Sequence, residues 1–400
     1  MLNRENKQIM MLTESEEGRK RTNRLIIVMV ILALLGALAL FWLIRARQED
    51  SGWREITAKG NSEPDCSSFF TFWYQIQPSE GGRDFNAVQI AYTEAVRRAY
   101  KIFDTARPHE GIQGLWAVNA NPGAVLTVEP ELYQAFALME EYGGRFLYLA
   151  PVYAVYNELF FSRDDGYAKE WDPYYSSQTA EYFADLMPYL GSPEHIRLEL
   201  LGENRVCLQI SEEYRRFARE NEISVFLDFY WMQDAFLLDL VGESILATGY
   251  RRGYIVSREG WVFCLDDSEE SYALIVSHRQ GDLVRDAAQM RYRGPSRIIT
   301  LKNYTEENDP LDYYYIYEDG RFATAYIDPA DGYYKSSLND LLLYSHRASC
   351  GRLLLEGIQM MLSGPQDAQG QSRLESEGIW PVYFRGDSLV SGGDAEFLLP

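Results

Sequence analysis

The strongest pattern in the chain is an unbroken apolar run over residues 25–44, LIIVMVILALLGALALFWLI, which contains no charged residue. A helix rises about 1.5 Å per residue, so this run reaches about 30 Å, the hydrocarbon thickness of a bilayer. A cleaved signal peptide is the competing interpretation, but its apolar region is usually only about 7 to 15 residues long. Here the run continues beyond Ala37-Leu38-Ala39, which could mimic a cleavage site. The pattern therefore favours an uncleaved transmembrane helix.

Basic residues flank this predicted span unequally. Four lie within residues 19–24 before it, whereas Arg45 and Arg47 follow it. Because cytoplasmic flanks carry the excess of Lys and Arg, residues 1–24 are expected to form a cytoplasmic tail in a single-pass protein of the cell membrane. Residues 45–64 are polar and contain glycine and proline, which predicts a linker. The extracytoplasmic domain is then expected over residues 65–400.

Strand-like and helix-like patterns alternate through the first half of this domain. The aromatic run FFTFWYQIQ over residues 69–77 predicts a strand, and residues 85–104 repeat apolar side chains at helical spacing. Residues 125–142 predict a short strand followed by a helix that opens at Glu129-Pro130-Glu131, since proline is tolerated in a first turn. Gly143-Gly144 is expected to end that helix.

The second half contains more strand patterns than helix patterns. Strands are predicted at IRLELL, VCLQI, GYIVS, ALIVS, RIITL and LLLYS, with helices over residues 232–247 and 352–362. The Gly- and Gln-rich residues 364–373 predict a loop. The run DYYYIY over residues 312–317 favours a half-buried strand over a sugar-stacking surface. No linker-like break interrupts these elements, so the sequence predicts one domain of the α+β class.

Composition and charge restrict the chemistry of this domain. The chain is 46% hydrophobic and 24% charged, which is typical of a globular protein, and its net charge of −21 argues against nucleic acid as a partner. Four widely spaced cysteines permit disulfides without requiring them. No C-x-x-C pair occurs and the four histidines are scattered, so a zinc site is not expected. Walker, G-x-S-x-G and H-E-x-x-H motifs are also absent.

Three segments nevertheless resemble motifs of one family, in the same order. LDFYWMQDAFLLD over residues 227–239 is similar to L-D-x-G-G-I-A-K-G-Y-A-V-D, VSREGW over residues 256–261 to V-N-x-G-G-D, and AYIDPADGYY over residues 325–334 to H-I-x-D-P-x-T-G-Y-P. A weaker match places Phe69-Phe70-Thr71 at an M-G-T strand. Residues 66–364 thus resemble the FAD:protein FMN transferases, the ApbE-type flavin transferases, as a divergent member.

This resemblance implies a fold, a reaction and a set of ligands. Members of the family break the FAD pyrophosphate and transfer FMN to a Thr or Ser hydroxyl of a partner protein, and Mg²⁺ offsets the phosphate charge. Carried over by position, the cofactor contacts fall on Thr71, Asp228, Asp234 and Asp328. Two of these have a structural alternative: Asp228 could cap a helix, and Asp328 could open an Asp-Pro turn.

The chain departs from the family at positions that carry chemistry. Tyr230 and Trp231 replace two glycines whose missing side chains would let backbone amides approach a phosphate. Asp234 replaces a lysine, although some members tolerate an acid there. Trp261 replaces the aspartate of G-G-D, and Ala325 replaces the histidine.

Two further departures concern an aspartate and the metal site. Leu147 replaces the aspartate of the family's G-G-x-F-D motif. The family's metal-binding pair, D-x-x-x-T, has no counterpart here, because its positions hold either Arg352 and Glu356 or Leu354 and Ile358. No metal ligands are therefore predicted.

These departures lead to a leading hypothesis and two alternatives. The leading hypothesis is a membrane-anchored, extracytoplasmic binding or interaction module that has lost transferase activity, with a membrane protein as partner and FAD and Mg²⁺ implied by resemblance alone. The first alternative is an active, divergent Mg²⁺-dependent transferase that uses Asp228, Asp234 and Glu259 as an altered metal site. The second is a module that binds flavin without transferring it.

Overall fold

The computed structural model describes residues 29, 32, 35, 36, 38, 52–60, 63–77, 81–281, 283–306, 309 and 312–399. The chain divides into two compact units, Met1–Trp53 with Gln75–Asn86 and Arg54–Tyr74 with Ala87–Pro400. In the first unit, the described residues are five helical positions before residue 40, the beginning of one strand, the end of a second strand, and the start of helix α2 (Gly81–Phe103). Every site discussed below lies in the second unit.

The predicted membrane span over residues 25–44 lies outside the described residues, except for five helical positions. Among the residues that are described, no helix is both long and apolar enough to cross a bilayer. The predicted tail over residues 1–24 also lies outside them. The membrane anchor and the orientation therefore stay predictions.

The largest sheet has eight strands in the order β1-β2-β6-β7-β10-β13-β14-β15. From β2 to β15 the neighbours pair antiparallel, for example with Phe70 of β2 opposite Ser257 of β6. The strands are β1 (Gly52–Ile56), β2 (Phe70–Ile76), β6 (Gly253–Ser257), β7 (Val262–Cys264), β10 (Ser296–Lys302), β13 (Asp340–Ser345), β14 (Trp380–Arg385) and β15 (Ser388–Val390).

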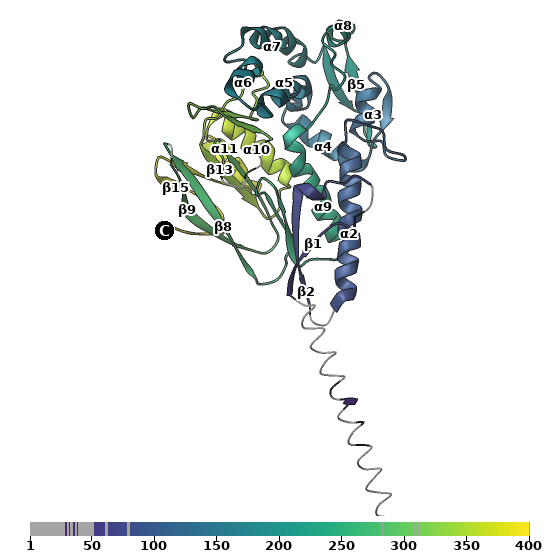
Figure 1. Ribbon diagram of the computed structural model, residues 1–400, viewed down its shortest axis with the longest axis vertical. Helices are drawn as coiled ribbons and strands as arrows, with labels where there is room; N and C mark the ends of the chain where they lie inside the picture. The colour runs from purple at the N-terminus through teal and green to yellow at the C-terminus, as the bar shows by residue number, and fades with distance from the viewer. Residues whose placement is uncertain are drawn as a thin grey trace, which may run out of the picture. The chain divides into compact units, whose positions relative to one another are not determined.

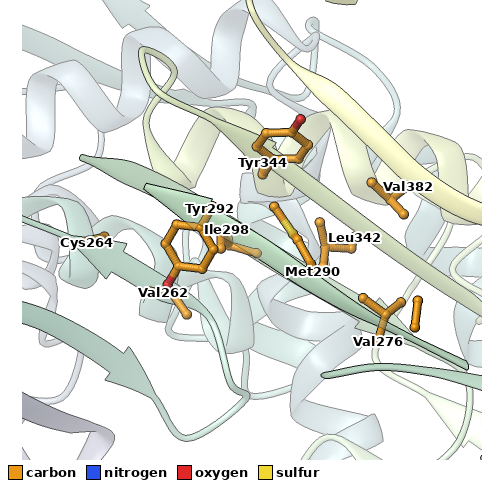
Figure 2. Packing of buried hydrophobic residues seen from close by; sticks show 10 residues of the cluster. Val262, Cys264, Val276, Met290, Tyr292, Ile298, Leu342, Tyr344 and Val382 are labelled. Carbon is orange, nitrogen blue, oxygen red and sulfur yellow. The ribbon is translucent and has the colours of Figure 1, made fainter. Parts of the chain in front are cut away.

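Both faces of this sheet are covered at β13, which explains why the strand LLLYS is buried throughout. On one face, Leu343 lies under helix α10 (Cys350–Ser363), where a Cβ on Gly357 would approach the Leu343 Cδ1 to 2.9 Å. Side chains alternate along a strand, so Leu342 and Tyr344 point to the other face. There they join a core with Met290 from the second sheet, β16-β9-β8 (Figure 2).

The remaining elements complete the second unit. Figure 1 shows α5, α6, α7 and α8 gathered at one end of it. The helices are α3 (Leu115–Ala120), α4 (Pro130–Glu141), α5 (Ala150–Phe160), α6 (Asp165–Trp171), α7 (Ser177–Leu190), α8 (Glu212–Glu220), α9 (Gln233–Ala247) and α11 (Ala368–Ser376). The strands are β3 (Val125–Thr127), β4 (Ile196–Leu200), β5 (Arg205–Ile210), β8 (Ser271–Gln280), β9 (Leu283–Arg293), β11 (Tyr314–Ile316), β12 (Phe322–Thr324) and β16 (Glu396–Leu398), and the 3₁₀ turns are η1 (Ser67–Phe69), η2 (Arg145–Leu149) and η3 (Tyr230–Met232).

The structure confirms the α+β class and most predicted elements, and it corrects two. The loop predicted over residues 364–373 contains the start of α11. Asp367 caps this helix, since its side chain accepts a hydrogen bond from the amide of Gly370. The linker predicted over residues 45–64 contains β1, an edge strand of the large sheet whose Ile56 is buried. Polar sequence concealed both elements, because each buries only one residue.

All four cysteines, Cys66, Cys207, Cys264 and Cys350, are free and buried. The disulfides that their number permitted are therefore not formed. Cys66 packs at the start of the domain, where its Sγ donates a hydrogen bond to the carbonyl oxygen of Val96 over 3.2 Å. These residues act as small apolar side chains in the core.

Candidate functional site

A cleft of about 280 Å³ opens where η1, the end of α2, α5, α9 and the segment before β11 meet. Its lining is aromatic and acidic, and within the described part of the chain no Lys, Arg or His lines it. The rings come from Phe69, Tyr100, Phe103, Phe161, Tyr230 and Tyr313, and the carboxylates from Asp104, Asp228 and Asp312.

Asp228, one of the predicted cofactor contacts, lies in this cleft. Its Oδ1 accepts a hydrogen bond from the amide of Tyr230 over 2.9 Å, and its own amide donates to the carbonyl oxygen of Leu147. The bond to Tyr230 is a local turn bond of the kind that a capping residue makes. Burial raises the pKa of Asp228 to about 6, although backbone hydrogen bonds oppose the shift. The carboxyl group therefore both holds a turn and faces the cleft.

The backbone of Tyr230 has a conformation that glycine usually adopts. Its φ of +48° lies in the left-handed region, which a bulky residue rarely adopts. The ring stacks on Tyr153 with centroids 4.6 Å apart, and the hydroxyl donates to Asn157 Oδ1 over 2.9 Å. These contacts hold the ring in place and offset the strain of the backbone.

Trp231 fills the interior behind this turn. It is 3% exposed, and its indole nitrogen donates to the Tyr153 hydroxyl over 3.2 Å. Its ring packs against Tyr326 and Trp261 at centroid distances of 5.4 and 6.2 Å. Trp261 in turn donates its indole N–H to the carbonyl oxygen of Thr300. Aromatic rings thus occupy the space around residues 230 and 231.

Arg258 lies beside Asp234, one of the predicted cofactor contacts, and sequence patterns did not single it out. Its Nε lies 3.3 Å from Asp234 Oδ2 and 3.1 Å from Glu259 Oε1, and its Nη1 lies 2.8 Å from Asp312 Oδ2. Its guanidinium group also lies over the ring of Phe69, 4.6 Å from the centroid. One guanidinium therefore joins three carboxylates and an aromatic ring.

Asp234, a second predicted contact, is completely buried beside Arg258, and its Oδ1 has no hydrogen-bond partner among the described atoms. Burial and then the charge of Glu259 raise the pKa of Asp234 well above its ordinary value. Burial also raises the pKa of Glu259. Asp234 therefore holds a proton more readily than an exposed aspartate would, and it does not line the cleft.

No family model matches the sequence, and no curated protein matches it. Among solved structures, the ApbE protein from Thermotoga maritima is similar over 86% of this chain and 96% of its own, with a TM-score of 0.54 and 14% identity. The flavin transferase ApbE from Vibrio cholerae is similar over 86% of this chain and 97% of its own, with a TM-score of 0.53 and 13% identity. The chain has the ApbE fold. At this sequence identity the similarity establishes only the fold, and the activity has to be inferred from the residues of the site.

The other two predicted cofactor contacts lie elsewhere in the ApbE-like fold. Thr71 is exposed on β2, opposite Val256 of β6, and does not line the cleft. Asp328 opens the predicted turn: its Oδ1 accepts from the amide of Ala330, and its Oδ2 lies 2.6 Å from Lys335 Nζ. Of the four predicted residues, the structure brings only Asp228 to the cleft.

Asp239, the third aspartate of the ApbE-like segment LDFYWMQDAFLLD, anchors a helix. Its two carboxylate oxygens accept hydrogen bonds from the amides of Cys350 and Gly351, each over 2.8 Å. These amides belong to the first turn of α10, where backbone N–H groups lack partners within the helix. Burial raises the pKa of Asp239 to about 6. Its role is to fix α10 against α9.

The positions that resemble the metal pair of the ApbE family make structural contacts. Glu356 is completely buried and forms two 2.7 Å hydrogen bonds with Arg373 of α11. Arg352 pairs with Glu141 at 2.8 Å and with Glu377 at 3.3 Å. The alternative pair of positions, Leu354 and Ile358, is buried in the core.

The altered metal site considered from the sequence is not assembled. Across the described residues, no group of three His, Cys, Asp or Glu side chains is arranged to hold a metal ion. Asp234 and Glu259 converge on Arg258, whereas Asp228 faces the cleft. The three carboxylates therefore do not share a site.

Asn119 positions the cleft, and sequence reasoning missed it. Its Oδ1 accepts from the amides of Phe226 and Leu227, and its Nδ2 donates to the carbonyl oxygen of Leu227, each over 2.9 Å. This buried side chain on α3 thus satisfies the irregular backbone that leads to Asp228. No local signal identifies it, because its partners lie more than 100 residues further along the chain.

Proposed function

We propose that this chain is a binding protein of the ApbE fold that does not transfer FMN. The observation that carries the proposal is Tyr230, which retains a left-handed backbone while a bulky ring, stacked on Tyr153, replaces the open space of a glycine. A backbone that favours glycine gives phosphates close access only when no side chain is present. The turn has a backbone conformation that favours glycine, and its use as a phosphate cradle is the property that we infer to be lost.

The residues around this turn do not fit the flavin pyrophosphate and Mg²⁺ that the family resemblance implies. The rings of Tyr230 and Trp231 take the space next to the backbone amides. The positive charge facing Asp234 and Glu259 is the guanidinium of Arg258, which would repel a divalent cation. No step of FMN transfer is therefore derived for this chain.

A direct transfer assay tests the proposal. The full chain, purified in a neutral sugar detergent because residues 25–44 are apolar, is mixed with FAD, Mg²⁺ and a peptide that carries an acceptor threonine. We expect no covalent FMN on the peptide by mass spectrometry. The flavin transferase ApbE from Vibrio cholerae, with a peptide that it modifies, provides the positive control. Covalent FMN on the peptide would refute the proposal.

Restoring the glycines provides a second arm of the same assay. The double variant Tyr230→Gly/Trp231→Gly opens the space beside the turn but leaves the charge of Arg258 in place. We expect it to remain inactive. A yellow purified protein that shows a flavin absorbance spectrum but transfers no FMN would instead favour the second alternative, a module that binds flavin without transferring it.

We further propose that residues 25–44 anchor the protein in the cell membrane, with the N-terminus in the cytoplasm. The uncharged length of this segment and the basic residues before it support this proposal. Sodium carbonate extraction and external protease treatment of intact spheroplasts test it. Release of the chain by carbonate would contradict the anchor, and protection of the domain in sealed cells would contradict the orientation.

A further inference from the structure

Among the described residues, two of the three carboxylates of the cleft lie beside an arginine. Asp104 Oδ2 is 3.5 Å from Arg107 Nε, and Asp312 Oδ2 is 2.8 Å from Arg258 Nη1. Asp228 forms no ion pair within the described part of the chain, and its carboxylate accepts from backbone amides, that of Tyr230 over 2.9 Å. A partly buried carboxylate gains stability from a positive charge brought into its cleft.

The aromatic side chains around Asp228 are also suited to a positively charged ligand. The rings of Tyr230 and Tyr313 both line the cleft, with centroids 5.9 Å apart at an angle of 73°. Aromatic faces attract cations within about 6 Å of the ring centroid, and alkylated ammonium groups suit them especially well. Arg258 already lies over Phe69 and Tyr313 in this way, at 4.6 and 5.2 Å.

The size and charge of the cleft narrow the choice of ligand. Its volume of about 280 Å³ is just below the range of about 300 to 1,000 Å³ typical of pockets for drug-sized ligands. A compact head group is therefore a better match than a dinucleotide. No basic side chain lines the cleft among the described residues, and the whole chain has a net charge of −21. This charge raises the local concentration of cations and opposes anions.

We propose that the cleft binds a compact organic cation, an alkylammonium group, with Asp228 as its counter-ion and the rings of Tyr230 and Tyr313 as its walls. This inference names the ligand class of the binding function proposed above, and it rests on that proposal. The cation is supplied either by a small molecule or by an alkylated lysine of a protein partner. Both carry the same chemistry, and the experiment separates them.

Isothermal titration calorimetry on the full chain in neutral detergent and amine-free buffer tests the inference. The probes are choline, a peptide that contains trimethyllysine, and 3,3-dimethyl-1-butanol, the uncharged isostere of choline. We expect choline or the peptide to bind and the isostere to bind at least about tenfold more weakly, because it lacks the charge. The tighter of the two charged probes identifies the source of the cation.

Two matched variants assign the binding to Asp228. Asp228→Asn removes the charge while its Oδ1 can still accept from the Tyr230 amide, and we expect choline affinity to fall at least about tenfold. Glu213→Gln removes one charge from an exposed position on α8 and should leave affinity unchanged. Thermal unfolding of each variant verifies that it is folded, and the comparison of choline with its isostere needs no variant.

Three results would overturn the inference. They are the absence of binding by both charged probes, equal affinity for choline and its uncharged isostere, and unchanged choline affinity in Asp228→Asn. Covalent FMN transfer in the earlier assay would refute the proposed function instead. The two failures are therefore distinguishable, since one is read from calorimetry with cations and the other from the mass of an acceptor peptide.

Discussion

Replacing Asn119 by leucine should strongly destabilise the protein. Leucine has the same number of side-chain heavy atoms with the same branching at Cγ, so the change removes hydrogen bonds without leaving a void. Asn119 is 6% exposed and bonds three backbone groups of the irregular segment before Asp228, two N–H groups and one carbonyl. The substitution leaves all three without a side-chain partner.

The magnitude follows from these three groups. A buried polar group that loses its partner costs about 1 to 3 kcal/mol, and water that enters the site recovers part of that cost. Taking the lower half of the range, about 1 to 2 kcal/mol, for each of the three groups gives a loss of about 3 to 6 kcal/mol. Because domains are usually stable by only about 5 to 15 kcal/mol, this is a large fraction of the total.

Equilibrium urea unfolding of the two proteins measures this loss, and hydrogen exchange at Phe226 and Leu227 localises it. The control is Asn121→Ala at the C-cap of the same helix, an exposed asparagine whose Nδ2 donates to the carbonyl oxygen of Ala117. The control should lose less than about 1 kcal/mol. A loss below about 1 kcal/mol for Asn119→Leu, or an equal loss for the control, would refute the reasoning.

Choline affinity should rise as pH increases through about 6, because burial raises the pKa of Asp228 to about 6 and only the ionised carboxylate attracts the ligand. Titrations between about pH 5 and 8 measure this, and Asp228→Asn reveals any slope due to the other two carboxylates of the cleft. Asp239→Ala should lower stability by about 2 to 4 kcal/mol in urea unfolding, since two amides of α10 lose a charged acceptor. Gly253→Ala should destabilise the fold by more than about 1 kcal/mol, because its Cβ would lie 2.2 Å from a carbonyl oxygen of β2, whereas Gly60→Ala, with open space around it, should not.

Elements whose own residues carry the signal could be predicted from the sequence. The helical spacing of residues 85–104 predicts α2, and the proline after Glu129 marks the first residue of α4. β1 and α11 were missed because Ile56 and Leu374 are the only buried residues that they contribute. With one buried position, a segment has no periodicity, and polar composition then resembles a loop.

The site was predictable only in part for a related reason. Asp228 could be found from its place in a segment that resembles a family motif. Arg258 and Asn119 could not, because their roles depend on partners that are distant in the sequence. Asp312 lies 54 positions from Arg258, and Phe226 lies 107 positions from Asn119. Such contacts exist only once the chain has folded.

The four buried thiols can report local unfolding of the protein. Each thiol is at most 3% exposed, so a thiol reagent in native buffer cannot reach it. Burial also raises the pKa of Cys264 to about 11, so this thiol is not present as the reactive thiolate at neutral pH. Cys66, Cys207 and Cys350 report from three other parts of the fold. Mass spectrometry of the labelled cysteines would therefore give opening free energies region by region, without denaturant and without engineered probes.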